Sequence, residues 1–355
     1  MRALLAIAGL LVIAGVAAAA TPQPTTLKQL SVPVRAVAQD GGMLAWLASD
    51  KTKCNTVHIV GNGKTYVLPH PTNGSMTCHW NLANGPEQLA IASSGTPAAL
   101  WTLHEGGSDF VMTAQVGGPE KEVDRLAHQT DGTGWWLSSV TGGGTTLAYS
   151  SVDVEYVNPI ACGEGGSCKK YIAGGGIYLV AAGQKTLLHS SGPALGLAVS
   201  GGRIAYIRAT DVAKGGKPAS TADAPVQVVD LSDGAVVSRA KPVGIPLAVG
   251  LSPHVLAVLS RNGYNLRLTW YDPATGRKLG GIGVPVQTAS ELAVNDQFAV
   301  YRFGVHLRAL AVAKDHIHVL GKTGPAYLGL SLDQGRLVWA ENSQSSGRIR
   351  ALFLR

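Results

Sequence analysis

The chain has 355 residues, of which 29 are Lys or Arg and 22 are Asp or Glu, and its formal net charge is +7. Charged residues make up only 14% of it, and the basic ones are scattered, with no cluster beyond Lys169-Lys170. A protein that binds nucleic acid presents a concentrated basic patch, so this composition argues against nucleic acid as a partner. The 45 Gly and 18 Pro interrupt the chain too often for long helices and favour an all-β fold.

Residues 1–20 have the pattern of a secretory signal peptide. Arg2 precedes a short apolar run, and Ala18-Ala-Ala20 comes before a polar segment. We expect cleavage after Ala20, which leaves a net charge of +6 because Arg2 is the one charged residue removed. The alternative is an uncleaved anchor, for which the apolar run is marginal in length. The prediction is a secreted or periplasmic (extracytoplasmic) monomer with no membrane span after signal removal.

A short motif recurs seven times between residues 40 and 339. Each copy has a turn of small or polar residues, followed by an aliphatic–small–aromatic or aliphatic triplet. The copies are spaced by 39 to 57 residues. They end at Trp46, Trp101, Tyr149, Tyr206, Val258, Val300 and Trp339. A period of roughly 40–50 residues with several short strands per period is the signature of a β-propeller. We therefore predict an all-β, seven-bladed propeller that forms a single domain over residues 21–355.

The fourth and last units show how the ring is expected to fold and close. In the fourth unit, short β-branched segments bounded by turn residues predict strands at 195–200, 203–208, 225–230 and 235–238. The last unit offers three strands, at 326–332, 336–340 and 348–354. Residues 26–32 form a spare strand ahead of the first unit. We predict that this N-terminal strand pairs into the C-terminal blade, because that pairing removes exposed sheet edges.

The four cysteines fit an oxidising compartment. Cys54, Cys78, Cys162 and Cys168 can pair in three ways, and proximity in the sequence favours disulfides Cys54–Cys78 and Cys162–Cys168. The second bond would close a small loop and fix its shape more than stabilise the fold, since the entropic gain grows with loop length. The alternative is a redox or metal site at that pair, but CxxxxxC is not a zinc spacing.

The first candidates for a binding site are two long B–C connections in neighbouring blades. A B–C connection joins the second strand of a blade to the third strand of the same blade. Loops that exceed the minimum length are where function usually lies. They comprise residues 158–170 in blade 3 and the Gly-, Ala-, Ser- and Thr-rich residues 210–224 in blade 4, which we expect to be flexible. We predict that they form a ligand-binding lip on one face. Its residues are Glu164, Lys169, Lys170, Lys214 and Lys217. The alternative is that both loops are insertions without a ligand.

A third irregular segment, residues 70–85, links the first two blades on the same face. His79 and Trp80 would line a pocket beside the Cys54–Cys78 disulfide, and we add both to the predicted ligand-binding residues. The alternative is an aromatic side chain packed under a stapled loop.

Sequence motifs for catalysis and for cofactors are absent. No GxSxG turn, phosphate-binding GxxxxGK[ST] loop or DxDxDG calcium loop occurs. His316 and His318 alternate on one strand, but no third metal ligand follows from the spacing. Asp153 and Glu155 also alternate and would lie about 7 Å apart on one strand face. Such carboxylates are the groups that glycoside cleavage would need. We therefore predict no metal, no cofactor and no catalytic residue.

The segment Trp270-Tyr-Asp-Pro-Ala-Thr-Gly-Arg-Lys278 resembles the C–D turn of bacterial extracytoplasmic propellers with WD40-like, TolB-like or quinoprotein-like blades. Residues 228–234 are a looser copy. In such turns Asp and Thr hydrogen-bond the turn, and Gly takes the left-handed position. The tryptophan that follows this turn in quinoprotein blades is missing here, which argues against a quinone cofactor. The resemblance implies the fold rather than a specific activity.

Taken together, the sequence predicts a secreted, non-catalytic binding or scaffolding module at the cell envelope, with its ligand on the loop face. Its expected partner is an envelope protein or an acidic polysaccharide. The alternative is an extracellular glycan hydrolase or lyase with carboxylates at the channel mouth. Strand segments at the ring axis are poor in acidic groups, with Glu87 and Glu291 as the main exceptions, and this favours binding.

Overall fold

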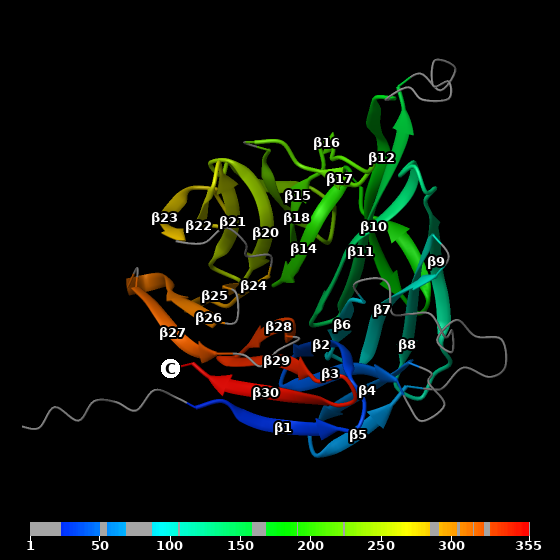
Figure 1. The fold of residues 1–355 in the computed structure, drawn as a ribbon, viewed down its shortest axis with the longest axis vertical. Coiled ribbons are helices and arrows are strands. Elements are labelled where there is room, and N and C mark those ends of the chain that lie inside the picture. The colour runs from blue at the N-terminus through cyan, green and yellow to red at the C-terminus, as the bar shows by residue number, and fades with distance from the viewer. Residues whose placement is uncertain are drawn as a thin grey trace, which may run out of the picture.

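The computed structural model describes residues 23–49, 55–68, 87–105, 107–157, 168–189, 191–222, 224–284, 291–303, 306–314, 316–322 and 327–354. Within these residues the chain forms seven four-stranded antiparallel sheets, arranged as blades around a central axis, and one two-stranded sheet (Figure 1). The predicted seven-bladed β-propeller is confirmed. The described residues contain no helix long and apolar enough to cross a membrane.

Each blade runs from an inner strand A, near the axis, to an outer strand D (Figure 1). Blade 1 consists of β2 (Val34–Asp40), β3 (Met43–Ser49), β4 (Asn55–Gly61) and β5 (Lys64–Val67). Blade 2 consists of β6 (Leu89–Ala92), β7 (Ala98–Glu105), β8 (Ser108–Gln115) and β9 (Lys121–Ala127). Blade 3 consists of β10 (Gly134–Gly143), β11 (Thr146–Tyr156), β12 (Lys170–Ala181) and β13 (Gln184–Leu187). Blade 4 consists of β14 (Ala194–Ser200), β15 (Arg203–Arg208), β18 (Val226–Asp230) and β19 (Val236–Ala240).

The remaining blades complete the ring. Blade 5 consists of β20 (Ile245–Leu251), β21 (Leu256–Asn262), β22 (Asn265–Tyr271) and β23 (Lys278–Val284). Blade 6 consists of β24 (Leu292–Val294), β25 (Phe298–Phe303), β26 (His306–Ala311) and β27 (His316–Lys322), with a 3-10 turn, Val312–Lys314, before β27. Blade 7 consists of β28 (Tyr327–Asp333), β29 (Arg336–Asn342), β30 (Gly347–Phe353) and β1 (Thr25–Leu30).

The N-terminal strand closes the ring as predicted. β1 pairs antiparallel with β30 and occupies the outer position of blade 7 (Figure 1). The Arg350 guanidinium also donates to the carbonyl of Pro24 at 2.9 Å. Nearer the axis, the Asn342 amide both donates to the carbonyl of Val34 (2.7 Å) and accepts from its N–H (2.9 Å). Blade 7 is therefore hydrogen-bonded both to the N-terminal segment that supplies its outer strand and to the first residue of β2 in blade 1.

The residue that ends each repeated motif lies on strand B of its blade and is buried. All seven are at most 3% exposed. They are Trp46, Trp101, Tyr149, Tyr206, Val258, Val300 and Trp339. Their clusters join neighbouring blades: Trp46 packs in a cluster with Val338 of blade 7, and Trp339 in a cluster with Val300 of blade 6. The repeat therefore marks the apolar contacts between sheets.

The predicted C–D turn of blade 5 has the expected chemistry. The Asp272 carboxylate accepts from the N–H of Ala274 at 2.8 Å, and the Thr275 hydroxyl accepts from the N–H of Arg277 at 3.3 Å. Gly276 has φ +71°, and a Cβ there would lie 2.3 Å from the carbonyl oxygen of Arg239 in blade 4. Glycine is thus required both by the left-handed backbone and by the neighbouring blade.

The long connection of blade 4 contains a hairpin that the sequence did not predict, formed by β16 (Asp211–Val212) and β17 (Pro218–Ala219). The expected flexibility of residues 210–224 remains a prediction. The N–H of Ala213 donates to the carbonyl of Lys217 at 2.8 Å and closes the turn of the hairpin. Ala209, at the base of the hairpin, is buried. Val212 and Ala209 pack against Val152 of blade 3. An apolar base holds the hairpin on the neighbouring blade, which composition alone does not reveal.

Candidate functional site: a cavity covered by the blade 4 hairpin

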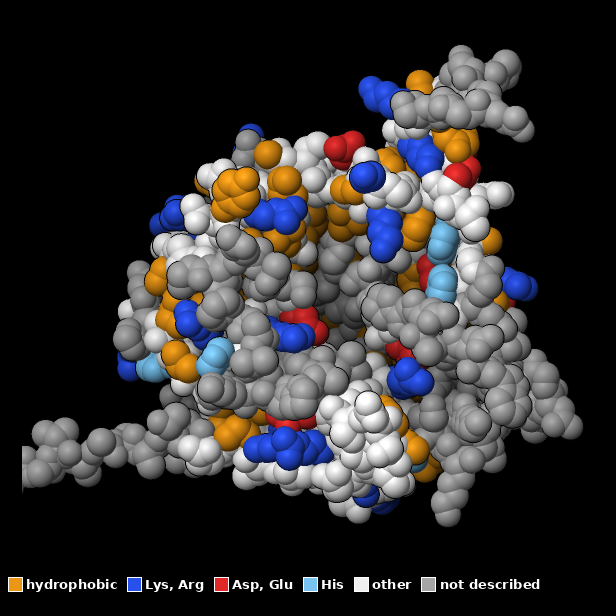
Figure 2. All heavy atoms as spheres, in the orientation of Figure 1, with side chains coloured by type: hydrophobic (Ala, Val, Ile, Leu, Met, Phe, Trp, Pro, Cys, Tyr) orange, Lys and Arg blue, Asp and Glu red, His pale blue; other side chains and the backbone are white. Residues whose placement is uncertain are grey.

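A cavity of about 390 Å³ lies between blades 2, 3 and 4, on the face that carries the B–C and D–A connections. We call it the hairpin-covered cavity, because Lys217 and Pro218 of the β16–β17 hairpin form one wall. Figure 2 shows this face, with two histidine side chains next to each other in the region of β9 and β10. The charged and aromatic residues of the lining are His104, Asp109, His128, Trp136 and Lys217.

Three aromatic rings from two blades and their connection form a stack at this cavity. The His128 imidazole lies on the Trp136 indole, with ring centroids 3.9 Å apart and planes 14° apart. The His104 imidazole follows, with its centroid 5.8 Å from that of His128. The indole N–H donates to the carbonyl of Gly132 at 3.0 Å, which fixes the ring that supports the stack.

Asp109 orients the first imidazole of the stack. Its Oδ1 lies 2.8 Å from Nδ1 of His104, and its Oδ2 accepts from the N–H of Leu137 at 3.3 Å. The two residues are register partners across the β7–β8 hairpin, so the sheet itself brings them together. A carboxylate only accepts hydrogen bonds, so Nδ1 of His104 carries the proton and Nε2 is left to interact with other groups.

His128 is the electrostatically perturbed member of the site. Burial lowers the pKa of its imidazole below the ordinary value. Asp109 raises the pKa, whereas His104 and Lys217 lower it further. Its Nδ1 is buried and has no hydrogen-bond partner among the described residues. Perturbed groups of this kind collect at functional sites.

Two glycines allow the hairpin to dock against the connection between blades 2 and 3. A Cβ on Gly216 would lie 2.5 Å from Cα of Gly132, and a Cβ on Gly132 would lie 2.6 Å from Cα of Gly216. Both residues also have positive φ, +83° and +91° respectively. Side chains at these positions would separate the two segments, so glycine sets the position of Lys217 relative to the ring stack.

The structure brings only some of the predicted ligand-binding residues to this cavity. Lys217 lines it, whereas Lys214, on the same hairpin, is exposed and does not. Lys169 is exposed, and Lys170 donates to the carbonyl of Asp131 and lies over the Tyr156 ring. Three predicted ligand-binding residues, Glu164, His79 and Trp80, lie outside the described part of the chain and remain predictions.

The predicted disulfides also remain predictions. Cys54 and Cys78 lie outside the described residues, as does the predicted partner of Cys168. Cys168 itself is half-buried beside the start of β12, and the described part of the chain contains no free cysteine.

A second cavity, of about 480 Å³, lies on the other side of His128. Its lining includes Trp135, Asp153 and Glu155, so the two alternating carboxylates do share one surface. Burial raises the pKa of the Asp153 carboxyl, and the negative charge of Glu155 raises it further. The Tyr171 hydroxyl donates to Glu155 at 3.0 Å. The pair lies on β11, the second strand of blade 3, and neither carboxylate lines the channel mouth formed by the A–B turns.

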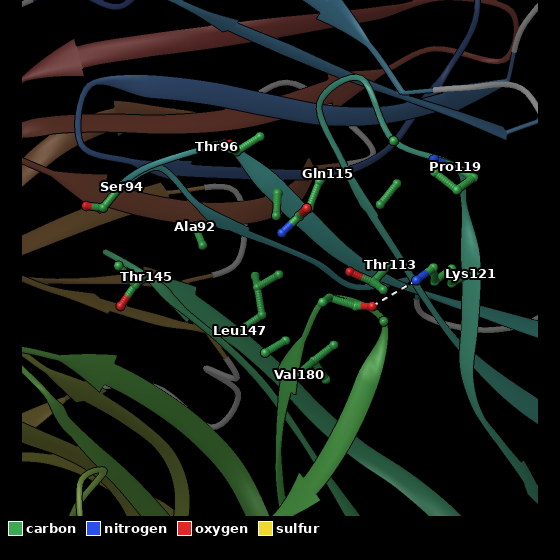
Figure 3. Close-up of a pocket in the computed structure, with 16 residues that line it drawn as sticks. Ala92, Ser94, Thr96, Thr113, Gln115, Pro119, Lys121, Thr145, Leu147 and Val180 are labelled. Atoms are coloured by element: carbon green, nitrogen blue, oxygen red, sulfur yellow. Dashed lines mark hydrogen bonds between the residues drawn. The ribbon is translucent and has the colours of Figure 1, made fainter.

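The opposite face carries the A–B and C–D turns, and it contains two further cavities. A cavity of about 340 Å³ between blades 2 and 3 is lined by small apolar and hydroxyl side chains, with Lys121 donating to the carbonyl of Ala182 at 2.9 Å (Figure 3). The channel mouth, of about 750 Å³, is lined by the A–B turns and carries Asp40, Asp296 and Asp333.

These three carboxylates join neighbouring blades. Asp40 accepts from the N–H groups of Ser93 and Gly144, both at 2.9 Å. Asp333 accepts from Gly42 N–H at 2.8 Å and Asp296 from His254 N–H at 3.1 Å. Their hydrogen bonds give them a structural role in the ring.

The comparisons with known proteins agree with the fold. No protein-family model matches the chain, and no curated protein matches it in sequence. A chain in the crystal structure of the Mitotic Checkpoint Complex is similar, with TM-score 0.52 at 12% identity over 99% of both chains. The Cps50 (Swd1) β-propeller domain of Myceliophteria thermophila gives TM-score 0.50 at 11% identity over 92% of this chain and 99% of that one.

BamB from Moraxella catarrhalis is also similar, with TM-score 0.47 at 9% identity over 92% of this chain and 99% of that one. At such identities the likeness concerns the fold alone. The seven four-stranded sheets define the class of protein as a β-propeller, and function has to be argued from the site.

Proposed function

We propose that this protein is a secreted, non-catalytic binding module of the cell envelope, and that its ligand occupies the hairpin-covered cavity. The observation that carries the proposal is the convergence of groups from three blades on one cavity. His104 comes from blade 2, Trp136 from blade 3 and Lys217 from blade 4. Binding sites are typically concave, with a few polar groups placed among apolar and aromatic walls.

The proposed location rests on the sequence. Residues 1–20 combine one positive charge, a short apolar run and small residues before a polar segment. The low content of charged residues and the four cysteines are consistent with an extracytoplasmic protein. The bacterial extracytoplasmic propellers that the blade 5 turn resembles support the same setting.

A pull-down with matched variants tests the proposal. Residues 21–355 are immobilised, exposed to envelope extract of the organism that makes the protein, and washed with increasing salt. We expect a partner that survives high salt with the wild type and with Lys214→Glu but is lost with Lys217→Glu. Both lysines are exposed and lie on the same hairpin connection, and only Lys217 lines the cavity.

Two results would count against this function. Retention lost at moderate salt in every variant would mean diffuse attraction to acidic polymer, because salt screens exposed charges. Equal retention by both lysine variants would place the binding surface elsewhere.

One observation favours a second candidate, an extracellular glycan hydrolase. Asp153 has a raised pKa beside Glu155, and two carboxyl groups in different environments are the usual acid and base of glycoside cleavage. Trp135, 38% exposed, lies in the same cavity. Screening for release of reducing sugar from envelope glycans, with Asp153→Asn and Glu155→Gln as inactive controls, separates this candidate from the first.

A further inference from the structure

We propose that the hairpin-covered cavity binds the oxyanion of an acidic ligand, a carboxylate or a phosphate, between Lys217 and the imidazoles of His104 and His128. The proposal rests on the function proposed above and names the chemical class of its ligand.

The first argument for an anionic ligand is the balance of charge in the cavity. Asp109 is the acidic residue of the lining, and both of its oxygens already have partners, His104 and the N–H of Leu137. Lys217 forms no ion pair with any described carboxylate, and it is close enough to influence His128 electrostatically. The cavity therefore holds a cation that no carboxylate in the described part of the chain neutralises, next to two ionisable rings.

The second argument for an anionic ligand is the nitrogen of His128 that has no hydrogen-bond partner among the described residues. Buried polar atoms almost always have a hydrogen-bond partner, and one that lacks it calls for an explanation. Nδ1 of His128 is such an atom among the described residues, and because it has almost no exposed surface, it contacts an anion in the cavity only when the imidazole turns over on the Trp136 indole. His104 adds Nε2, because its Nδ1 is held by Asp109. Protonated imidazoles and an ammonium are the donors that form strong, charge-assisted hydrogen bonds with oxyanions.

The neighbouring cavity shows that the charge is segregated. On the other side of His128, Asp153 and Glu155 line the surface, and that side would repel an anion. The connection from His128 to Gly134 separates this acidic side from the Lys217 side. An anion is thus directed to the hairpin-covered cavity.

Binding of an anion should be coupled to proton uptake. The groups that act on His128 are Asp109, His104 and Lys217, and the last two oppose its protonation. A bound anion offsets their positive charge and favours the protonated ring, so affinity should rise as the pH falls.

Isothermal titration of residues 21–355 tests the inference with three defined probes: glucuronate, inorganic phosphate and glucose. We expect one or both anions to bind, and glucose not to bind. Affinity should be about tenfold higher near pH 5.5 than near pH 8. Glucuronate decides the pH dependence, because its carboxylate stays ionised over this range. Binding of phosphate alone or of glucuronate alone identifies which oxyanion the cavity accepts.

Matched variants locate the site. Lys217→Gln should weaken anion binding by about tenfold, whereas Lys214→Gln should leave it within about twofold. His128→Phe keeps a ring on Trp136 and should weaken the pH dependence. The inference is overturned if neither anion binds at either pH, if glucose binds as tightly, or if both lysine variants lose binding equally. If neither anion binds but the pull-down still depends on Lys217, this inference fails and the proposed binding function stands.

Discussion

The imidazole of His128 lies flat against the indole of Trp136, with ring centroids 3.9 Å apart. His128 comes from the connection between blades 2 and 3, and Trp136 from the inner strand of blade 3. This contact and the docked β16–β17 hairpin bring residues of blades 2, 3 and 4 together around one cavity. The functional argument depends on this relationship, and the predictions below test its parts.

Stability should depend on pH through His128. Burial lowers the pKa of the folded imidazole below its ordinary value of 6.5, so the unfolded chain binds the proton more readily. The corresponding stability is present above pH 6.5 and is lost as the pH falls through the folded pKa. We expect denaturant midpoints of the wild type to fall between about pH 7.5 and pH 5.5, and to fall less in His128→Phe.

His254→Gln is the control, because that side chain is exposed and outside the cavity. The same pH dependence in wild type and His128→Phe would show that other groups are responsible.

Docking of the hairpin should depend on Gly216 rather than on Gly215. Both have positive φ, +83° and +87°, so alanine at either costs about 1 kcal/mol of backbone strain. A Cβ on Gly215 meets nothing within 4 Å, whereas one on Gly216 would overlap Gly132. Gly216→Ala should therefore undock the hairpin and speed tryptic cleavage after Lys214 several-fold over Gly215→Ala. Equal cleavage of the two variants would refute the docking.

Removal of β1 should open the ring. Deletion of residues 25–30 leaves the edge of β30 unpaired and removes the fourth strand of blade 7. We expect a melting temperature lower by several degrees and aggregation that grows with concentration, because exposed edges pair with other chains. Lys28→Gln, an exposed change on the same strand, should leave both unchanged. A deletion variant as stable as the wild type would contradict closure by this strand.

The buried repeat residues should dominate stability. Trp339 is 1% exposed and its indole donates to Glu341 at 2.8 Å. Trp339→Ala should lower the free energy of unfolding by about 3–5 kcal/mol. Tyr264, 86% exposed on the β21–β22 turn, is the matched aromatic control, and its alanine variant should stay within about 0.5 kcal/mol. Similar losses for both would mean that the repeat does not mark the core.

The fold was predictable because its signal is repeated and local. Turn residues and buried triplets occur in every blade, and the strands predicted for blade 4 differ from β14, β15, β18 and β19 by at most two residues at either end. The Asp272 to Gly276 turn was predicted by the same local chemistry, since its hydrogen bonds lie within a few residues.

The site was mostly not predictable, because its residues are far apart in the sequence and come together only when blades 2, 3 and 4 pack side by side in the ring. Lys217 was found from the length of its loop, but His128 and Trp136 carry no spacing signal that relates them to it. His104 and Asp109 could have been paired, since Gly106-Gly107 is a typical hairpin turn signal and these two residues face each other across the β7–β8 hairpin. The docking of the hairpin depends on glycines more than 80 residues apart, Gly132 and Gly216, which no local pattern connects.

Hydrogen exchange measured with and without the envelope fraction recovered in the pull-down tests the central claim most directly. If the ligand occupies the hairpin-covered cavity, protection should increase in residues 102–109, 128–138 and 211–219 and stay unchanged at the A–B turns. Protection confined to the A–B turns at the channel mouth, or to the surface around Asp153 and Glu155, would contradict it.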